Sequence, residues 1–274
     1  MPFHGNGWNP STITRAVNGF TTSTRTVRVD TDQGEGFLKA LGNPEGPHAL
    51  ACELVGSLAA DWLGLKTLDF SLINVIDPYE VAFDGQSWAQ PGPAFISRAE
   101  SMPLQWGGDS QTIASISNLE DISRIVVLDT WIRNCDRHSP DGRRINRNNV
   151  FLVQRAHPRR ILELFAMDFT HAFTCGGPID RRIGHIEKIR DDSIFGRFPE
   201  FEMHLSREDV VACAERLEGF DMAVAESFVA RVPIEWQVSA EACGAWKKFL
   251  VDRAHFTADT VVNRLWPDSD GLPF

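Results

Sequence analysis

Three polar residues in the middle of the chain have the side chains and the order that phosphoryl transfer requires. Asp136 lies within a polar stretch at residues 134–149, Asn149 ends that stretch before the apolar run at residues 150–153, and Asp168 follows a second apolar run. One carboxylate can orient an incoming hydroxyl, while an amide oxygen and a second carboxylate can hold Mg²⁺ on a nucleotide. The pattern therefore predicts transfer of a phosphoryl group to a hydroxyl.

Each of these residues also has a structural interpretation. Asp136 could cap a turn and pair with Arg137 in solvent, and Asp168 could end a strand at a turn. A single Asp would favour this interpretation. The combination of Asp136, Asn149 and Asp168 instead favours a catalytic one, in which Asp136 is the base or orienting residue and Asp168 binds the metal.

A lysine in the first half of the chain could serve the same site. Alternation along residues 36–41 places Lys39 on the same face as Phe37, which is the apolar side of a predicted sheet. An inward-facing ammonium needs an anionic partner, and Glu53 on the following predicted helix is the candidate. The alternatives are an edge-strand charge for Lys39 and a solvated helix face for Glu53.

Local patterns in the first part of the chain predict the elements that position Lys39 and Glu53. Turn residues separate three short β-prone runs, which predict an antiparallel meander. Apolar residues recur at helical spacing over residues 46–63, and Gly64 is a plausible C-cap. A break between two lobes is expected within residues 98–110. The predicted strands are residues 13–17, 26–30, 37–41, 72–75, 81–83 and 94–96.

The second part of the chain is mainly helical. Apolar residues at steps of three and four predict a helix that starts near Asn118, a possible N-cap, and leads to the stretch that holds Asp136. A strand hairpin after Asn149 would bring Asp168 back beside it. The predicted elements are strands at residues 150–153 and 160–165, joined by a His157-Pro158 turn, and helices at residues 206–217, 221–230 and 239–265.

With these residues and this order of elements, the chain resembles protein-kinase-like folds, and most closely the HipA-like kinase families. The resemblance covers about residues 12–175 by motif and the remainder by helical character. The Asp136-Arg137-His138 motif is also similar to the Asp-Arg-His motif of phosphatidylinositol kinases. The resemblance implies an α+β, bilobal fold, with a β-rich N-terminal nucleotide-binding lobe at residues 1–100 and an α-helical, catalytic C-terminal lobe at residues 101–274.

The resemblance also assigns roles to individual residues. Lys39 takes the place of the kinase strand lysine that contacts the nucleotide phosphates, and Glu53 is its helix partner. Asn149 and Asp168 take the places of the metal-binding Asn and of the Asp in the Asp-Phe-Gly motif, although Thr170 replaces the Gly. Because Thr has less backbone freedom than Gly, we expect movement of this segment to be restricted.

The spacing of the metal-binding residues departs from the kinase pattern. Twelve residues separate Asp136 from Asn149, compared with about four in protein kinases. The extra residues are expected to loop out without moving either end. Asn148 or Asn146 could be the metal ligand instead, but the position of Asn149 directly before the strand best matches the family. The insertion carries Asp141, Arg143, Arg144 and Arg147.

The polar loop at residues 18–24 lies between the first two predicted strands, where kinases cover the nucleotide phosphates. It lacks the Gly-x-Gly-x-x-Gly form, but its amides and the hydroxyls of Thr21, Thr22 and Ser23 could contact phosphate oxygens. In some HipA-like kinases this loop carries an autophosphorylated Ser, and Ser23 or a neighbouring Thr could serve similarly. A flexible polar hairpin is the alternative. By order along the chain, the adenine is expected near Phe95, Ile96 and Ser97.

The composition argues against several other classes of function. The 274 residues, 43% of them hydrophobic, suit a globular chain, and a net charge of −10 gives no overall basic surface for nucleic acid. Five Cys without a Cys-x-x-Cys pair indicate neither a zinc site nor a disulfide framework. His138 and His171 lack the spacing of a metal hydrolase. Without a signal-like start or a membrane-length apolar run, the protein is expected in the cytoplasm.

The sequence therefore predicts a kinase that uses ATP and Mg²⁺, and the resemblance implies Ser or Thr of a protein as the acceptor. Two alternatives remain open. The Asp136-Arg137-His138 motif suggests a lipid or small-molecule kinase. The insertion, together with Thr170, allows a pseudokinase that binds nucleotide without turnover and acts as an interaction module. Retention of Lys39, Asp136 and Asp168 weighs against that alternative.

Overall fold

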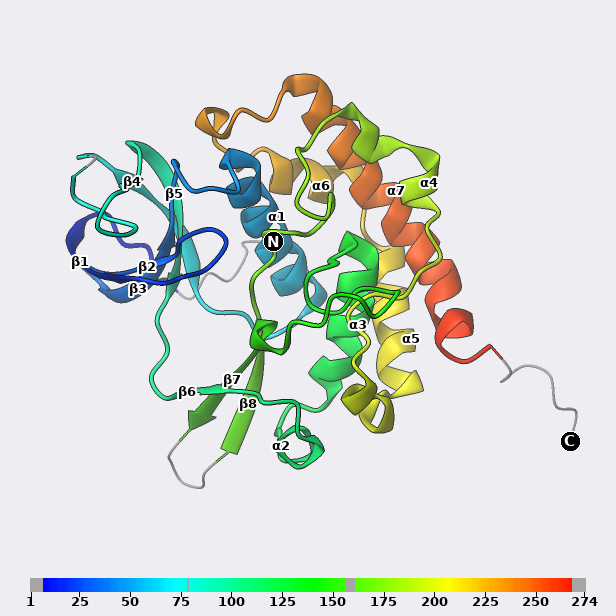
Figure 1. Ribbon diagram of the computed structural model, residues 1–274. Coiled ribbons are helices and arrows are strands. Elements are labelled where there is room, and N and C mark those ends of the chain that lie inside the picture. The colour runs from blue at the N-terminus through cyan, green and yellow to red at the C-terminus, as the bar shows by residue number, and fades with distance from the viewer. Residues whose placement is uncertain (1–6, 78, 156–160, 268–274) are drawn as a thin grey trace, which may run out of the picture.

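The computed structural model describes residues 7–77, 79–155 and 161–267 and places an antiparallel sheet at the N-terminal side of the chain (Figure 1). This sheet has five strands in the order β1-β2-β3-β5-β4. The meander predicted for the first three strands is present, and β5 lies next to β3, which carries Lys39. The strands are β1 (Ile13–Gly19), β2 (Val27–Thr31), β3 (Gly34–Lys39), β4 (Phe70–Val75) and β5 (Gly92–Arg98).

The helix α1 (Pro47–Leu63) lies between this sheet and the remaining helices (Figure 1). It has apolar residues around most of its circumference because it packs on both sides, and the helix ends at Gly64 in the left-handed conformation, φ 87°. Glu53 is therefore carried on a helix that is almost fully buried, and its carboxylate needs a partner inside the protein.

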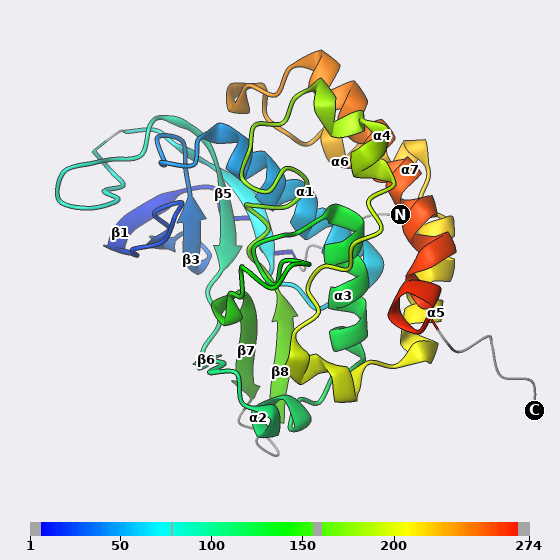
Figure 2. The same ribbon diagram turned by 45° about the vertical axis from the view of Figure 1, so that its right-hand side comes forward.

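A second, three-stranded sheet and the helix α3 (Glu120–Ile132) frame the polar stretch that contains Asp136. Figure 2 shows β7 and β8 below the five-stranded sheet, with α3 beside them. The helix ends at Arg133, whose left-handed conformation (φ 52°) turns the chain into the Asp136 loop. The sheet consists of β6 (Pro103–Gln105), β7 (Val150–Arg155) and β8 (Ile161–Ala166), and the short helix α2 (Ser110–Ala114) precedes α3.

The C-terminal part of the chain is helical and packs around the largest apolar core. Ser206, Asp221 and Ser239, the first residues of the three predicted helices, cap them through their side chains. The α-helices are α4 (Ile186–Ile189), α5 (Arg207–Glu218), α6 (Met222–Val229) and α7 (Ala240–Leu265), and the short 3₁₀ helices are η1 (Arg147–Asn149), η2 (Arg181–Gly184), η3 (Pro199–His204) and η4 (Ile234–Trp236). Within the described residues, no helix is both long and apolar enough to cross a membrane.

The predicted α+β architecture is confirmed, but two local predictions are wrong. Residues 81–83 form only an isolated bridge, between Ala82 and Trp88, instead of a strand. Asn118 does not cap α3, because its side chain bonds to Asp121 and to the backbone of Leu164. The predicted His157-Pro158 turn lies outside the described residues, and the division into lobes at residue 100 stays a prediction.

Candidate active site

A buried ion pair positions the loop that contains Asp136. Asp129 on α3 accepts hydrogen bonds from Arg137 Nε at 2.7 Å and from Asn134 Nδ2 at 3.0 Å, and Asp129 and Arg137 are fully buried. The other guanidinium nitrogens of Arg137 donate to the backbone oxygens of Asn149 and, at 3.1 Å, of Met167. Arg137 thus joins three chain segments, and its predicted alternative pairing with Asp136 in solvent is wrong.

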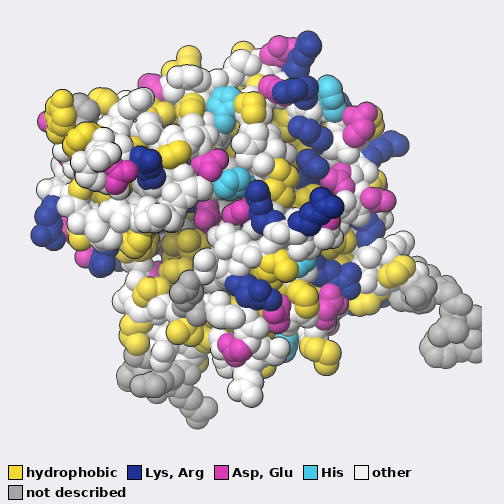
Figure 3. All heavy atoms as spheres, in the orientation of Figure 1, with side chains coloured by type: hydrophobic (Ala, Val, Ile, Leu, Met, Phe, Trp, Pro, Cys, Tyr) yellow, Lys and Arg dark blue, Asp and Glu magenta, His cyan; other side chains and the backbone are white. Residues whose placement is uncertain are grey.

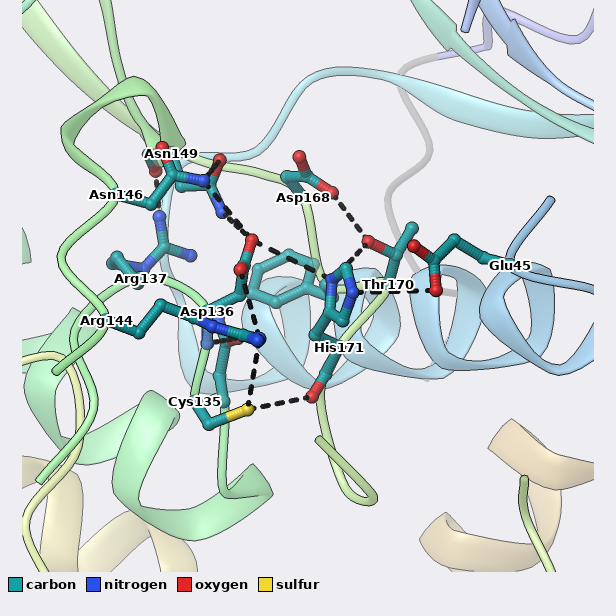
Figure 4. A network of polar contacts seen from close by, with 12 residues as sticks. Glu45, Cys135, Asp136, Arg137, Arg144, Asn146, Asn149, Asp168, Thr170 and His171 are labelled. Carbon is teal, nitrogen blue, oxygen red and sulfur yellow. Dashed lines mark hydrogen bonds and ion pairs between the residues drawn. The ribbon is translucent and has the colours of Figure 1, made fainter. Parts of the chain in front are cut away.

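The carboxylate of Asp136 is held by amides from its own loop (Figure 4). Asn149 Nδ2 donates to Asp136 Oδ2 at 2.9 Å, and Asn146 Nδ2 donates to the same oxygen at 3.3 Å. Arg144 contacts Oδ1 at 3.5 Å, and His171 Nδ1 lies 3.8 Å from Oδ2. These contacts hold the carboxylate in place, and the Asp136 side chain stays 17% exposed.

The sequence suggested that the insertion after Asp136 loops out, but the structure shows that it folds back toward the site. Ser139 N donates to the backbone oxygen of Arg144, and Asn146 N donates to that of Arg137, each at 2.9 Å. The insertion therefore folds back and delivers Asn146 to the carboxylate. Asn146 also donates to Asn149 Oδ1 at 3.1 Å, so two of the three candidate Asn residues belong to one network.

Lys39 lies between two carboxylates at the edge of the cavity between the two sheets. Its Nζ donates to Glu53 Oε2 at 2.8 Å and to Asp168 Oδ1 at 3.0 Å, and the expected contact with Glu53 is therefore present. Burial opposes the charge of Lys39, but Asp168 and Glu53 raise its pKa above the ordinary value. Phe169 N also donates to Glu53 Oε2, which ties α1 to the Asp168 segment.

Asp168 is kept ionised and in an uncommon backbone conformation. Burial alone would raise the pKa of Asp168, but the charge of Lys39 and hydrogen bonds from Lys39 and Thr170 lower it below its ordinary value. Its φ of 62° lies in the left-handed region, which costs a non-glycine residue energy unless contacts stabilise it. Thr170 Oγ1 donates to Asp168 Oδ1 at 3.0 Å, so the Thr that replaces Gly supports this carboxylate.

The donor set around Asp168 suits Mg²⁺. Asp168 Oδ2 makes no hydrogen bond within the part of the chain that the structure describes. Within that part, no three His, Cys, Asp or Glu residues come together as a metal cluster. Mg²⁺ commonly uses one or two protein oxygens and completes its shell with phosphates and water. Asp168 and Asn149 fit this requirement, with the Asn149 oxygen shared with Asn146.

A mainly apolar cavity adjoins Lys39. It encloses about 780 Å³, part of it open to solvent, and Lys39, Glu53 and Asp168 line one end. The Phe70 and Phe95 rings are stacked with their centroids 5.8 Å apart. Flat aromatic and aliphatic walls suit a nucleotide base, while the charged end suits its phosphates. The apolar wall is formed by Phe20, Phe37, Leu68, Phe70, Phe95, Phe151 and Met167.

The structure brings only part of the predicted nucleotide-binding set to this cavity. Thr22, Phe95 and Ser97 line it, whereas Thr21 and Ser23 are exposed and do not. The side chain of Ile96 points into the core on the opposite face of β5, and the position of the adenine near residues 95–97 stays a prediction. Phe70 and Phe151 also line the cavity and were not among the predicted residues, although alternation along β4 and β7 was the available sequence signal.

Gly56 on α1 leaves room for Phe169, which follows Asp168. A Cβ at Gly56 would lie 2.3 Å from Phe169 Cβ, so we expect Gly56→Ala to lower the free energy of unfolding by about 1–3 kcal/mol. Gly244→Ala on α7 is the matched control, because its Cβ meets nothing within 4 Å and helix propensity should stabilise that variant by about 0.5–1 kcal/mol. Denaturant unfolding measures both; equal effects would contradict the contact.

Cys175, next to the Asp136 loop, should be the most reactive thiol. A hydrogen bond from Cys135, followed by the charges of Arg133 and Arg144, lowers the pKa of the exposed Cys175 to about 7. Burial raises the pKa of Cys213 to about 12. The thiolate is the form that reacts, so the rate of alkylation of Cys175 by iodoacetamide should rise as the pH increases through about 7. Peptide mass spectrometry at several pH values measures this, and preferential labelling of Cys213 would contradict it.

Known proteins share the fold and the sequence profile of this chain. The structure resembles the crystal structure of the Helicobacter pylori proinflammatory kinase CtkA, with a TM-score of 0.58 and 13% sequence identity over 92% of this chain and 96% of that one. At this identity the likeness concerns the fold. No curated protein matches the sequence significantly. The sequence profile of the HipA-like kinases matches residues 22–266, and the chain therefore belongs to the HipA-like kinase family.

Proposed function

We propose that this member of a kinase family transfers the γ-phosphoryl group of ATP, with Mg²⁺, to a Ser or Thr hydroxyl of a protein. The observation that carries the proposal is the position of Lys39 between Glu53 and Asp168 at the charged end of the apolar cavity. This arrangement joins a base-sized apolar space to a cation for phosphates and a carboxylate for a metal.

The roles of the residues follow from their contacts. Lys39 is charged and faces the cavity, so it would bind and orient the nucleotide phosphates, while Glu53 holds its ammonium in place. Asp168, through Oδ2, and Asn149 would hold Mg²⁺. The metal would neutralise charge on the phosphates and fix their orientation. Thr170 and Lys39 keep the Asp168 carboxylate ionised and oriented for this purpose.

Asp136 would receive the acceptor hydroxyl. As the acceptor oxygen bonds to the γ-phosphorus, the bond from that phosphorus to the β–γ bridging oxygen breaks, ADP leaves, and the hydroxyl proton passes to the Asp136 carboxylate. Asn146 and Asn149 hold the carboxylate by donating to Oδ2. Asp129 and Arg137, buried beneath the loop, fix its backbone.

The test is transfer from γ-labelled ATP in the presence of Mg²⁺, with candidate proteins, phosphoinositide vesicles and small hydroxyl compounds as acceptors. Label on Ser or Thr after acid hydrolysis supports the proposal. Label confined to lipid or to a small compound identifies the alternative kinase classes. Nucleotide binding without transfer to any acceptor identifies a nucleotide-binding interaction module.

A further inference from the structure

Cationic side chains gather beside Asp136 although the chain has a net charge of −10. In Figure 3, Lys and Arg side chains form a band on the half of the molecule that the helices build. Four cations come from separate segments, and two of them, Arg133 and Arg144, adjoin or contact the Asp136 loop. We call this group the cationic rim; it consists of Arg133, Arg144, Arg182 and Lys188.

Contacts tie the segments of the rim together. Arg253 donates to the backbone oxygen of Trp131 near the end of α3 and, at 2.8 Å, to that of Lys188 on α4. Arg144 lies 3.5 Å from Asp136 Oδ1 and 4.0 Å from Cys135 Sγ. The charges of Arg133 and Arg144 both act on Cys175. Burial lowers the pKa of Lys188, and the neighbouring charges of Arg133 and Arg182 lower it further. Like charges are therefore crowded along this surface.

Within the described part of the chain, two members of the rim, Arg144 and Lys188, lack a close carboxylate partner, whereas Arg133 and Arg182 each have one. Arg133 pairs with Asp191 at 2.8 Å, and Arg182 pairs with Asp180 at 2.5 Å. By contrast, no ion pair to Lys188 occurs among the residues that the structure describes. Arg144 is half exposed, and its only carboxylate contact there is the 3.5 Å approach to Asp136, the residue that would receive the acceptor. Of these two charges, that of Arg144 lies next to the carboxylate that would receive the acceptor hydroxyl.

We propose that the cationic rim binds carboxylate side chains of the acceptor protein on residues that flank the phosphorylated Ser or Thr. This inference rests on the proposed function, because it names the substrate class of the same site. The four cations come from the end of α3, the insertion, η2 and α4, so they can meet successive side chains of an extended segment. Partial neutralisation by Asp180 and Asp191 suits separate carboxylates better than one concentrated polyphosphate headgroup.

The test compares two Ser-containing peptides that differ only in having Glu or Gln beside the Ser. The double variant Arg182→Ala/Lys188→Ala should raise KM for the Glu peptide roughly five- to tenfold. We expect its kcat and its KM for ATP to change by less than about twofold. The effect should shrink at high salt, because exposed charges are screened.

Arg15→Ala is the matched control. Arg15 is 70% exposed and pairs with Asp30 at 2.6 Å on β1, just as Arg182 is 64% exposed and pairs with Asp180 at 2.5 Å. It matches the Arg182 half of the double variant, removes one positive charge from β1 instead of from the rim, and should leave both peptides unaffected. If the Glu and Gln peptides have equal KM values in the unmodified protein, the inference is overturned while the proposed function stands.

A binding measurement separates failure of the inference from failure of the proposed function. Fluorescence anisotropy of the labelled Glu peptide with the Asp136→Asn variant requires no transfer. If no acceptor is phosphorylated but the rim substitutions weaken peptide binding, the rim binds carboxylates and the proposed reaction is wrong. If phosphoinositide vesicles bind in a rim-dependent manner and the Glu peptide does not, the inference is overturned in favour of a lipid surface.

Discussion

Asp168→Ala should abolish Mg²⁺-dependent ATP binding while the chain remains folded. The substitution removes the proposed metal carboxylate and one of the two partners of Lys39, but Glu53 still pairs with the ammonium at 2.8 Å. Because substitutions even in residues that merely support metal ligands cost about 10–100-fold in affinity, we expect at least an approximately 100-fold loss here. Isothermal titration calorimetry with ATP, with and without Mg²⁺, measures the loss.

Asp252→Ala controls for the removal of one negative charge. Asp252 lies on α7 and pairs with Lys248, so its loss should not alter nucleotide affinity. Circular dichroism of both variants verifies that they are folded. If Asp168→Ala bound ATP and Mg²⁺ as tightly as the unmodified protein, Asp168 would not be a metal ligand, and the assignment of this site would be wrong.

Asp136→Asn should lower kcat by about 10²–10⁴-fold and leave nucleotide affinity nearly unchanged. The amide keeps the size of the carboxylate, and its oxygen can still accept from Asn149, which donates to Asp136 Oδ2 at 2.9 Å. The neutral amide is much less basic than a carboxylate, so it cannot take up the hydroxyl proton. Single-turnover transfer measured beside calorimetric ATP binding separates these two effects.

Asp141→Asn makes the same chemical change five positions further along the insertion. Asp141 is 55% exposed and binds Ser139 and Arg143 instead of the proposed reacting groups. Its kcat should match that of the unmodified protein. One outcome would reverse the roles assigned to Asp136 and Asp168. In that outcome Asp136→Asn loses nucleotide binding, while Asp168→Ala keeps nucleotide binding and fails only in transfer.

The sequence could predict the residues whose surroundings are local. Alternation placed Lys39 on the inner face of its strand, and a buried ammonium required a nearby acid, which identified Glu53. Helical spacing located the end of α3, and with it the Asp136 loop. The mixed fold, with a sheet followed by helices, followed from the same periodicities.

The residues that sequence reasoning missed depend on contacts between distant segments. Asp129 looked like one more position on a helix face, and only the packing of α3 beneath the loop reveals it as the partner of Arg137. Asn146 reaches Asp136 because the insertion folds back by hydrogen bonds that no local pattern specifies. Phe70 and Phe151 meet across a cavity between two sheets, so their shared role appears only in three dimensions.

The hydrogen bond from Arg137 to the backbone oxygen of Asn149 fixes the start and the end of the insertion relative to each other. Twelve residues lie between Asp136 and Asn149, yet the entropy of closing a loop grows only slowly with its length, by about 0.6 kcal/mol for each doubling. Sequence spacing and site geometry are therefore decoupled here. The loop can change in length and acquire new contacts with substrate while Asp136 and Asn149 keep their relative positions.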